Sequence, residues 1–289
     1  MPFIGLFETI KSVTCSCDPA IPCSQRGLSV DCVQPEAQFH FFARSFLTAP
    51  NALFFSFVVF MDHNNVLELP DGACIIRIES APFAENSYIL FRRDACDCLV
   101  IDPGFEPQKI VAAIRQRALV PQAIFLTHGH SDHIAGNAHL RQEWPNLPIL
   151  IGHGDASKLL DPAGNLSGAF GLELRSPPAN RTLVDGEVVL LAGFTISIWE
   201  IPGHSSGHIV FRIDGHSPPL VFGGDVLFQE GIGRTDFPDG DFTALAAGIV
   251  GKLYSLSDDT IVFPGHGDET TIGHERRHNP FVKDAACQD

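Results

Sequence analysis

Short apolar runs alternate with amphipathic segments from about Ala73 to the end of the chain. The apolar runs have the length of strands that are buried in a sheet. They are Cys74–Glu79, Ser87–Phe91, Cys98–Ile101, Ala123–Leu126, Val188–Leu191, Thr195–Ile201, His208–Ile213, Leu220–Phe222 and Thr260–Phe263. Helical spacing is found in Pro107–Ala118, Ile134–Glu143 and Phe242–Leu256. Many short strands separated by helices predict an α/β (α+β) fold in which helices cover the sheets.

The segment before Met61 lacks this alternation. It holds four cysteines whose spacings match no paired zinc-ligand pattern, and its longest uninterrupted apolar part, Leu53–Met61, is too short to span a bilayer. A cysteine-based metal knuckle and a membrane-associating or targeting segment are the alternatives. We expect residues 1–60 to be a poorly ordered N-terminal extension, with Met61 as the true start and residues 61–289 as the folded domain.

Composition adds constraints on partners and compartment. The formal net charge of −15 argues against non-specific binding to nucleic acid and against docking to anionic membranes, because both need clusters of cationic side chains. The eight cysteines are spread over a long chain rather than arranged as a disulfide framework. We therefore expect a cytoplasmic protein in a reducing compartment, without a stable membrane span. The sequence does not indicate an oligomeric state.

A cluster of histidines follows the apolar run Ala123–Leu126 directly. Three imidazoles and a carboxylate lie within six consecutive positions, at His128, His130, Asp132 and His133. Histidines two apart in an extended turn point to the same side, and Gly129 removes the Cβ that would crowd such a turn. Nitrogen and oxygen donors of this kind bind Zn²⁺, Fe²⁺ and Mn²⁺. The cluster predicts a metal site, with a chance histidine-rich surface turn as the alternative.

Three more donors follow later strands in the same way. His204 and His266 each come after a Pro-Gly pair, and Asp225 comes after a Gly-Gly pair. Donors that leave the same end of neighbouring strands converge at one edge of the sheet, where α/β proteins commonly place their sites. Each of the three signals is weak alone, but together with the cluster they favour the metal site.

This ordered set of donors resembles the ligand pattern of the metallo-β-lactamase superfamily. Within that superfamily the region from about 73 to 283 is most similar to the glyoxalase II (hydroxyacylglutathione hydrolase) branch, in a short form that lacks the C-terminal helical domain. The matching motifs are Glu85–Tyr88, Ile101–Gly104, Asn165–Ser167, Gly231–Asp236, Thr271–Gly273 and Asn279–Phe281.

The resemblance implies a four-layer αββα sandwich, the metallo-β-lactamase fold, with two divalent metal ions at one edge. Zinc is expected, with iron or manganese as alternatives. The resemblance places His128, His130 and His204 on one metal and Asp132, His133 and His266 on the second, with Asp225 bridging them. It also implies a binuclear metal-dependent hydrolase that cleaves a small-molecule thioester, S-lactoylglutathione or a related acyl-glutathione, by attack of a metal-bridging hydroxide. Asp132 would be catalytic as well, by orienting that hydroxide.

Supporting residues are predicted around the ligands. Asp102 is expected to accept a hydrogen bond from a ligand imidazole, unless it only caps its turn. Arg234, Arg276 and Arg277 are candidates for supporting the ligands or contacting substrate, and the last two could grip a glutathione carboxylate unless they are solvated surface charges. His208 is expected to have a structural or substrate-edge role.

Other functions stay open at this point, because the glutathione-binding helical domain of full-length glyoxalase II is missing. Persulfide dioxygenases resemble the chain too, and they use a single iron held by two histidines and an aspartate. A metallo-hydrolase acting on another ester, a lactone, a phosphodiester or a β-lactam is a further alternative. A non-enzymatic binding module is disfavoured, because a site that has lost its catalytic activity would be expected to have lost some of its metal donors as well.

Overall fold

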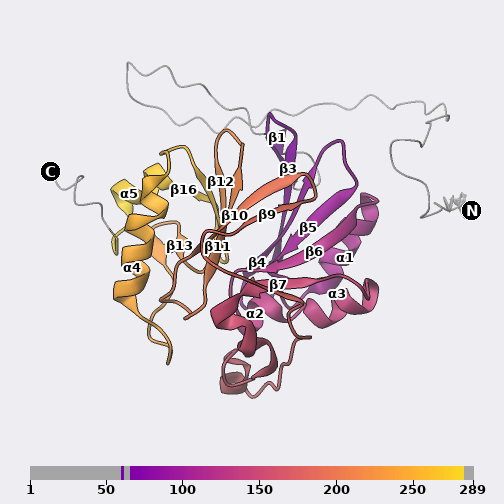
Figure 1. The fold of residues 1–289 in the computed structure, drawn as a ribbon, viewed down its shortest axis with the longest axis horizontal. Coiled ribbons are helices and arrows are strands. Elements are labelled where there is room, and N and C mark those ends of the chain that lie inside the picture. The colour runs from indigo at the N-terminus through magenta and orange to yellow at the C-terminus, as the bar shows by residue number, and fades with distance from the viewer. Residues whose placement is uncertain (1–59, 62–65, 283–289) are drawn as a thin grey trace, which may run out of the picture. The chain divides into compact units, whose positions relative to one another are not determined.

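Two β-sheets form the centre of the computed structural model, which describes residues 60–61 and 66–282 (Figure 1). The first sheet has eight strands in the order in which they occur along the chain. They are β1 (Phe60–Met61), β2 (Val66–Glu68), β3 (Ala73–Ser80), β4 (Glu85–Arg92), β5 (Asp97–Ile101), β6 (Val120–Leu126), β7 (Ile149–Gly152) and β8 (Arg181–Leu183). Strands β1 to β5 pair antiparallel, and β5 to β8 pair parallel.

The second sheet has six strands in the order β16-β15-β12-β11-β10-β9. They are β9 (Val188–Leu191), β10 (Phe194–Glu200), β11 (Ile209–Asp214), β12 (Leu220–Gly224), β15 (Ile261–Pro264) and β16 (Thr270–Thr271). Only β12 and β15 pair parallel among these described strands, so both end at the same edge of the sheet. A two-stranded hairpin of β13 (Leu227–Phe228) and β14 (Gly231–Ile232) follows β12.

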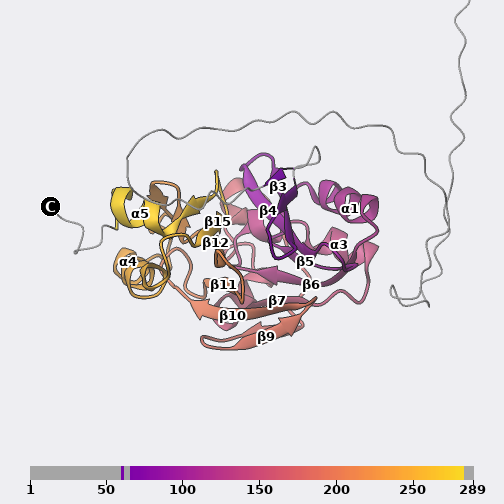
Figure 2. The same ribbon diagram turned by 90° about the horizontal axis from the view of Figure 1, so that it is seen from above.

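Helices cover the outer face of each sheet. On the first sheet lie α1 (Pro107–Gln116) and α3 (Asn137–Glu143), and on the second lie α4 (Phe242–Gly251) and α5 (Ile272–His278) (Figure 1). Figure 2 shows the same arrangement of layers from a perpendicular direction. The short helix α2 (Ser131–Ile134) and the 3₁₀ segments η2 (His153–Leu160), η3 (Ser167–Phe170) and η4 (Leu253–Ser255) complete the described elements.

Three apolar layers hold these elements together. Successive residues of β6 point to opposite faces, so Phe125 joins the core between the two sheets, while Ile124 and Leu126 pack beneath α1 and α3. A third cluster joins the second sheet to α4 and includes Leu245 and Ile249. Helix, sheet, sheet and helix layers with three cores between them make the αββα sandwich that the sequence predicted.

The predicted strands and helices are present, with two differences in the helices. The helix predicted at Ile134–Glu143 is two helices, because it begins at Ser131 and is interrupted at Gly136. The Gly136 N–H donates to the Pro103 carbonyl, and a Cβ there would lie 2.8 Å from the Gly104 carbonyl oxygen. The helix predicted at Phe242–Leu256 is α4 followed by the 3₁₀ turn η4.

The predicted N-terminal extension lies outside the described residues, apart from the backbone of Phe60. Among the residues that the structure describes, no helix has the length and apolar character needed to cross a membrane. Cys98 is a buried thiol that forms no disulfide. Burial raises the pKa of the Cys98 thiol to about 12, and the neighbouring Asp97 carboxylate adds to this rise.

Candidate metal centre

The ends of four strands bring the predicted donors together. β6 leads into the loop with His128 and His130 and then into α2, which carries Asp132 and His133. The loop after β10 carries His204. The parallel strands β12 and β15 end next to each other and deliver Asp225 and His266. The first sheet therefore supplies four donors and the second sheet three, across the seam between the sheets.

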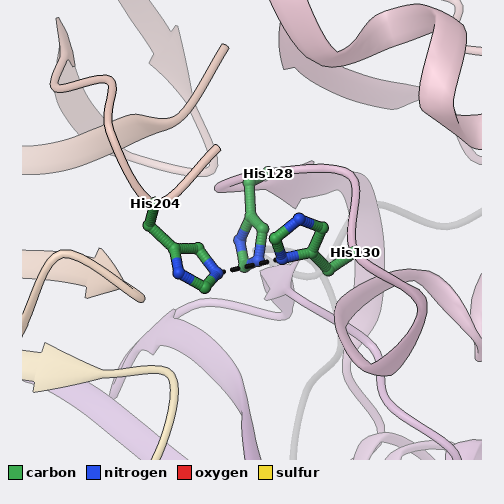
Figure 3. A group of neighbouring side chains, drawn as sticks. All are labelled: His128, His130 and His204. Atoms are coloured by element: carbon green, nitrogen blue, oxygen red, sulfur yellow. Dashed lines mark hydrogen bonds between the residues drawn. The ribbon is translucent and has the colours of Figure 1, made fainter. Parts of the chain in front are cut away.

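The donor atoms of these seven residues form three overlapping groups, and within each group they lie within 4.8 Å of one another. The groups are His128 with His130 and His204, His128 with His133 and Asp225, and Asp132 with His133 and His266. Figure 3 shows the first group, in which His130 Nδ1 lies 2.9 Å from His204 Nε2. The first and third groups are the two ligand sets that the sequence predicted.

Asp225 lies between the two predicted ligand sets. Its Oδ2 is 3.4 Å from His204 Nε2 and 3.5 Å from His266 Nε2, and its Oδ1 is 3.4 Å from His133 Nε2. These contacts join a histidine of one set to two histidines of the other. The position fits the bridging role predicted for Asp225.

Several donor atoms are buried without a hydrogen-bond partner among the described residues. They are the Nε2 atoms of His128, His130 and His133 and the Oδ1 atom of Asp225. A buried polar atom without a partner costs about 1–3 kcal/mol, and proteins rarely leave several of them in one place. Borderline nitrogen donors together with carboxylates are what Zn²⁺ and similar divalent ions bind. The residues present therefore fit a bound divalent metal.

The charge states of two of the donors, Asp225 and His128, agree with this fit. Burial alone would raise the pKa of Asp225, but the imidazoles of His133, His266 and His204 hold it well below its ordinary value. Burial, assisted by the surrounding imidazoles, lowers the pKa of His128 well below its ordinary value. An ionised carboxylate and a neutral imidazole are the forms in which these side chains bind metals.

Hydrogen bonds at Nδ1 orient two of the rings from the first sheet. Asp102 Oδ2 accepts from His133 Nδ1 at 3.1 Å, as the sequence predicted for this aspartate. Thr127 Oγ1 donates to the same carboxylate at 2.6 Å and lies 3.0 Å from His128 Nδ1. The Thr127 N–H also donates to Asp102 Oδ1, at 2.8 Å. Both rings consequently direct Nε2 towards the centre of the site.

Backbone carbonyls orient two rings from the second sheet in the same way. His204 Nδ1 lies 2.9 Å from the Arg234 carbonyl oxygen, and His266 Nδ1 lies 3.2 Å from that of Phe83. Sequence reasoning missed both contacts, since a carbonyl group is present at every residue and gives no signal of its own.

His208 supports the site from beneath and lies outside the three groups of donors. Its Nε2 accepts the N–H of Asp225 at 3.1 Å, and its ring stacks on His128 with the centroids 4.7 Å apart. Burial lowers the pKa of His208 well below its ordinary value, and His204 adds to the shift, so the ring is neutral and can accept this hydrogen bond. Of the two roles expected for His208, the structure shows the structural one.

The three predicted arginines lie in different places. Arg234 is at the rim, where its guanidinium stacks over the Phe237 ring at 4.4 Å and forms a bidentate pair with Asp236. Arg276 and Arg277 both pair with Asp258, and neither lines the cavity over the donors. The Arg276 guanidinium also donates to the Tyr254 and Leu256 carbonyls. Both tie α5 to the turn after η4, and the predicted contact of Arg276 and Arg277 with substrate stays a prediction.

A cavity of about 360 Å³ opens above the donors. Its floor contains Asp132 and Asp225, and most of its walls are apolar. The apolar lining residues are Phe83, Leu166, Phe170, Phe228, Ile232 and Phe237. Arg234 is the cation among the lining residues. An apolar cleft with a few convergent polar groups is typical of a small-molecule site.

Comparison with known proteins agrees with this site. The sequence model of the Metallo-beta-lactamase superfamily matches residues 81–266, and the chain belongs to that superfamily. A hydroxyacylglutathione hydrolase of Haemophilus influenzae, GloC, is 38% identical over 206 residues, which cover 69% of this chain and 93% of the relative. The chain is thus a metallo-β-lactamase superfamily hydrolase with histidine and aspartate groups able to bind metal.

Two solved structures extend the comparison. The BLEG-1 B3 metallo-beta-lactamase is 35% identical with a TM-score of 0.69, and the match covers 73% of this chain and all of that chain. TTHA1623 in a di-iron-bound form is 38% identical with a TM-score of 0.63, and the match covers 72% of this chain and all of that chain. The fold is shared with both, one of which is a B3 metallo-beta-lactamase and the other a di-iron-bound protein.

Proposed function

We propose that the protein hydrolyses a glutathione thioester, S-lactoylglutathione or a related acyl-glutathione, with two divalent metal ions. The observation that carries this proposal is the convergence of seven potential metal donors, five of which line a largely apolar cavity. The similarity to a hydroxyacylglutathione hydrolase over 93% of that relative supports the choice of a thioester.

The ligand sets follow from the groups of donors. His128, His130 and His204 would hold one ion, Asp132, His133 and His266 would hold the other, and Asp225 would contact both. Divalent ions held by these residues would supply a water of lowered pKa and would polarise the carbonyl of the substrate. Zinc suits the donors, and the di-iron form of TTHA1623 makes iron the first alternative to test.

Asp132 is the residue we propose to orient the attacking water. It lines the cavity, and its Oδ2 is 3.3 Å from His266 Nε2. Burial would raise its pKa, but His133 and His266 lower it, so that the carboxylate is ionised and accepts hydrogen bonds. An ionised carboxylate on the cavity floor can accept a hydrogen bond from the water and direct it towards the thioester carbonyl.

The remaining parts of the substrate fit the walls and the rim. The thiolate can leave without strong protonation, since thiol pKa values of about 8.5 are low compared with those of alcohols. The apolar walls can exclude water from the acyl group, and Arg234 at the rim can exchange Asp236 for a glutathione carboxylate. Loss of Arg234 should therefore raise KM more than it lowers kcat.

The test is hydrolysis of S-lactoylglutathione by the full chain. Activity that is abolished by a chelator and restored by Zn²⁺, Mn²⁺ or Fe²⁺ is the expected result, together with two metal ions per chain by elemental analysis. A protein that carries two metal ions and does not turn over the thioester would overturn the proposed substrate. A single iron with sulfite production from glutathione persulfide would instead support the dioxygenase alternative.

A further inference from the structure

A buried ion pair lies beside the metal donors without belonging to them. Asp155 and Lys158 face each other on η2, with Lys158 Nζ 3.0 Å from Asp155 Oδ1. The Asp155 side chain is fully buried, and that of Lys158 is 10% exposed. Buried charges are costly, because both ions lose their hydration. A buried ion pair next to the metal donors is therefore expected to have a structural or functional role.

The Asp155 carboxylate accepts hydrogen bonds from the two loops that carry the three-histidine group. Its Oδ2 accepts the N–H of Gly129, between His128 and His130, at 2.8 Å. Its Oδ1 accepts the N–H of Gly207, three residues after His204, also at 2.8 Å. The N–H groups of Gly129 and Gly207 therefore bind different oxygens of one carboxylate.

Lys158 and its neighbours hold the second loop at two more places. The Ser205 hydroxyl donates to Asp155 Oδ2 and contacts Lys158 Nζ. Lys158 Nζ also donates to Asp239 at 2.6 Å, and Asp239 in turn accepts the N–H of Ser206 at 2.9 Å. The loop after His204 is thus fixed at three consecutive residues.

The two loops and η2 pack so closely that they have little room to move relative to one another. A Cβ at Gly129 would lie 2.7 Å from the Lys158 Cβ, and one at Gly154 would lie 2.8 Å from the Gly207 Cα. A Cβ at Gly207 would overlap the backbone N of Asp155. Both loops therefore pack directly against η2, and the ion pair on η2 connects one loop to the other.

The loop of His266 is held elsewhere. The Asn86 N–H donates to the Gly265 carbonyl at 2.7 Å, and the Asn86 side chain donates to the Pro264 and Gly267 carbonyls. This loop belongs to the second group of donors, with Asp132 and His133. A change at Asp155 should consequently act on one group of donors more than on the other.

We propose that the Asp155–Lys158 pair is a positioning device that sets the separation of His128 and His130 from His204, and so determines the affinity of the three-histidine metal site. This inference rests on the proposed function only in requiring that the donors bind metal. It assigns no chemical step to either residue. Neither side chain is among the metal donors, and neither lines the cavity.

The test is Asp155→Asn in the full chain, with metal affinity measured by competition against a chelator. An amide keeps one acceptor oxygen, so it cannot accept the N–H groups of both Gly129 and Gly207. We expect one of the two bound ions to be held about 10- to 100-fold more weakly, as is common when a residue that orients ligands is lost. The other ion should keep its affinity, which also shows that the variant is folded.

Three further variants make the result specific. His204→Ala should weaken the same ion, and adding Asp155→Asn to it should have little further effect, because both act on one site. Asp239→Asn, at the partly exposed end of the network, should weaken that ion by a smaller factor. Asp161→Asn is the matched control, since this exposed carboxylate accepts the Ala163 N–H and should change neither affinity.

The outcomes separate this inference from the proposed function. Asp155→Asn with both ions at wild-type affinity, or with both weakened equally, would overturn the positioning role whatever the substrate is. A wild-type protein that binds two ions but cleaves no acyl-glutathione would overturn the proposed substrate, and the effect of Asp155→Asn on one ion would still support the positioning role.

Discussion

Single side chains orient two of the donor rings, His128 and His133, by hydrogen bonds at Nδ1. Asp102 is the clearest case, since one carboxylate receives hydrogen bonds from His133 Nδ1, the Thr127 hydroxyl and the Thr127 N–H. These three contacts also explain why Asp102 adopts a left-handed backbone with φ of 47°. A strained conformation persists where its surroundings require it.

Replacing Asp102 by Asn should therefore weaken metal binding. The amide cannot accept from both Thr127 and His133, so the His133 ring loses its fixed orientation. We expect the affinity of the ion bound by His133 to fall about 10- to 100-fold, measured by chelator competition. Asp97→Asn is the control, because this exposed carboxylate bonds Gln122 at the far end of β5. Equal affinities in the wild type and Asp102→Asn would contradict this role.

Asp239 provides a pH-dependent test of the network behind η2. Burial would raise its pKa, but the hydrogen bonds from Lys158 and Ser206 lower it from 3.8 to about 2. Because the pKa is lower in the folded state, the ionised form stabilises the fold above pH of about 4, and this contribution is lost as the pH falls towards 2. Urea unfolding at several pH values should show wild type more stable than Asp239→Asn near neutrality, with the difference shrinking below pH of about 4. A difference that does not change with pH would exclude this source of stability.

At the scale of the elements, nine of the strands were predicted, several of them because their residues are buried on both faces, whereas β7 and β8 were missed. Runs such as Ala123–Leu126 are continuously apolar, and alternate residues enter different cores. The break at Gly136 was not predictable, because it depends on the distant carbonyls of Pro103 and Gly104. Helix α5 was missed for another reason: its sequence is mostly polar, and it is held by Glu275 and Asn279 rather than by an apolar stripe.

Helix α4 begins at a side-chain cap, Asp241. The Asp241 side chain accepts the Ala244 N–H at 3.0 Å, and the helix packs Leu245 and Ile249 into the outer core of the second sheet. We expect Asp241→Ala to lower the free energy of unfolding by about 1 kcal/mol. Asp241→Ser should keep most of the wild-type stability, because serine is also a favourable cap residue. Urea denaturation measures both. Metal content should be unchanged in either variant, and a loss of metal from Asp241→Ala would show that the cap does more than begin the helix.

At the scale of the whole molecule, the seven donors were predictable and their surroundings were not. The donors occur in short motifs at strand ends, so local sequence is enough to find them. The groups that orient them come from distant segments, such as the Phe83 and Arg234 carbonyls and the Asp155 carboxylate. The sequence likewise does not reveal that Asp258 lies beside Arg276 and Arg277.

The division of the donors between the sheets has a consequence for the stability of the whole fold. Four donors come from the first sheet and three from the second, so ions bound there would join the two halves of the sandwich at one edge. Ions that bind the folded chain and not the unfolded one stabilise it, by about 4 kcal/mol when free metal exceeds Kd a thousandfold. For a domain of this size that corresponds to a Tm lowered by roughly 10 °C on removal of the metal.

Thermal unfolding of the full chain with and without a strong chelator measures this shift, and adding Zn²⁺ back should reverse it. A His204→Ala variant gives the matched comparison. Because this variant already holds one ion weakly, chelation should lower its Tm by less than it lowers that of the wild type. If chelation removes two ions and leaves Tm unchanged, the ions do not join the sheets, and the packing of the three apolar layers alone holds the sandwich together.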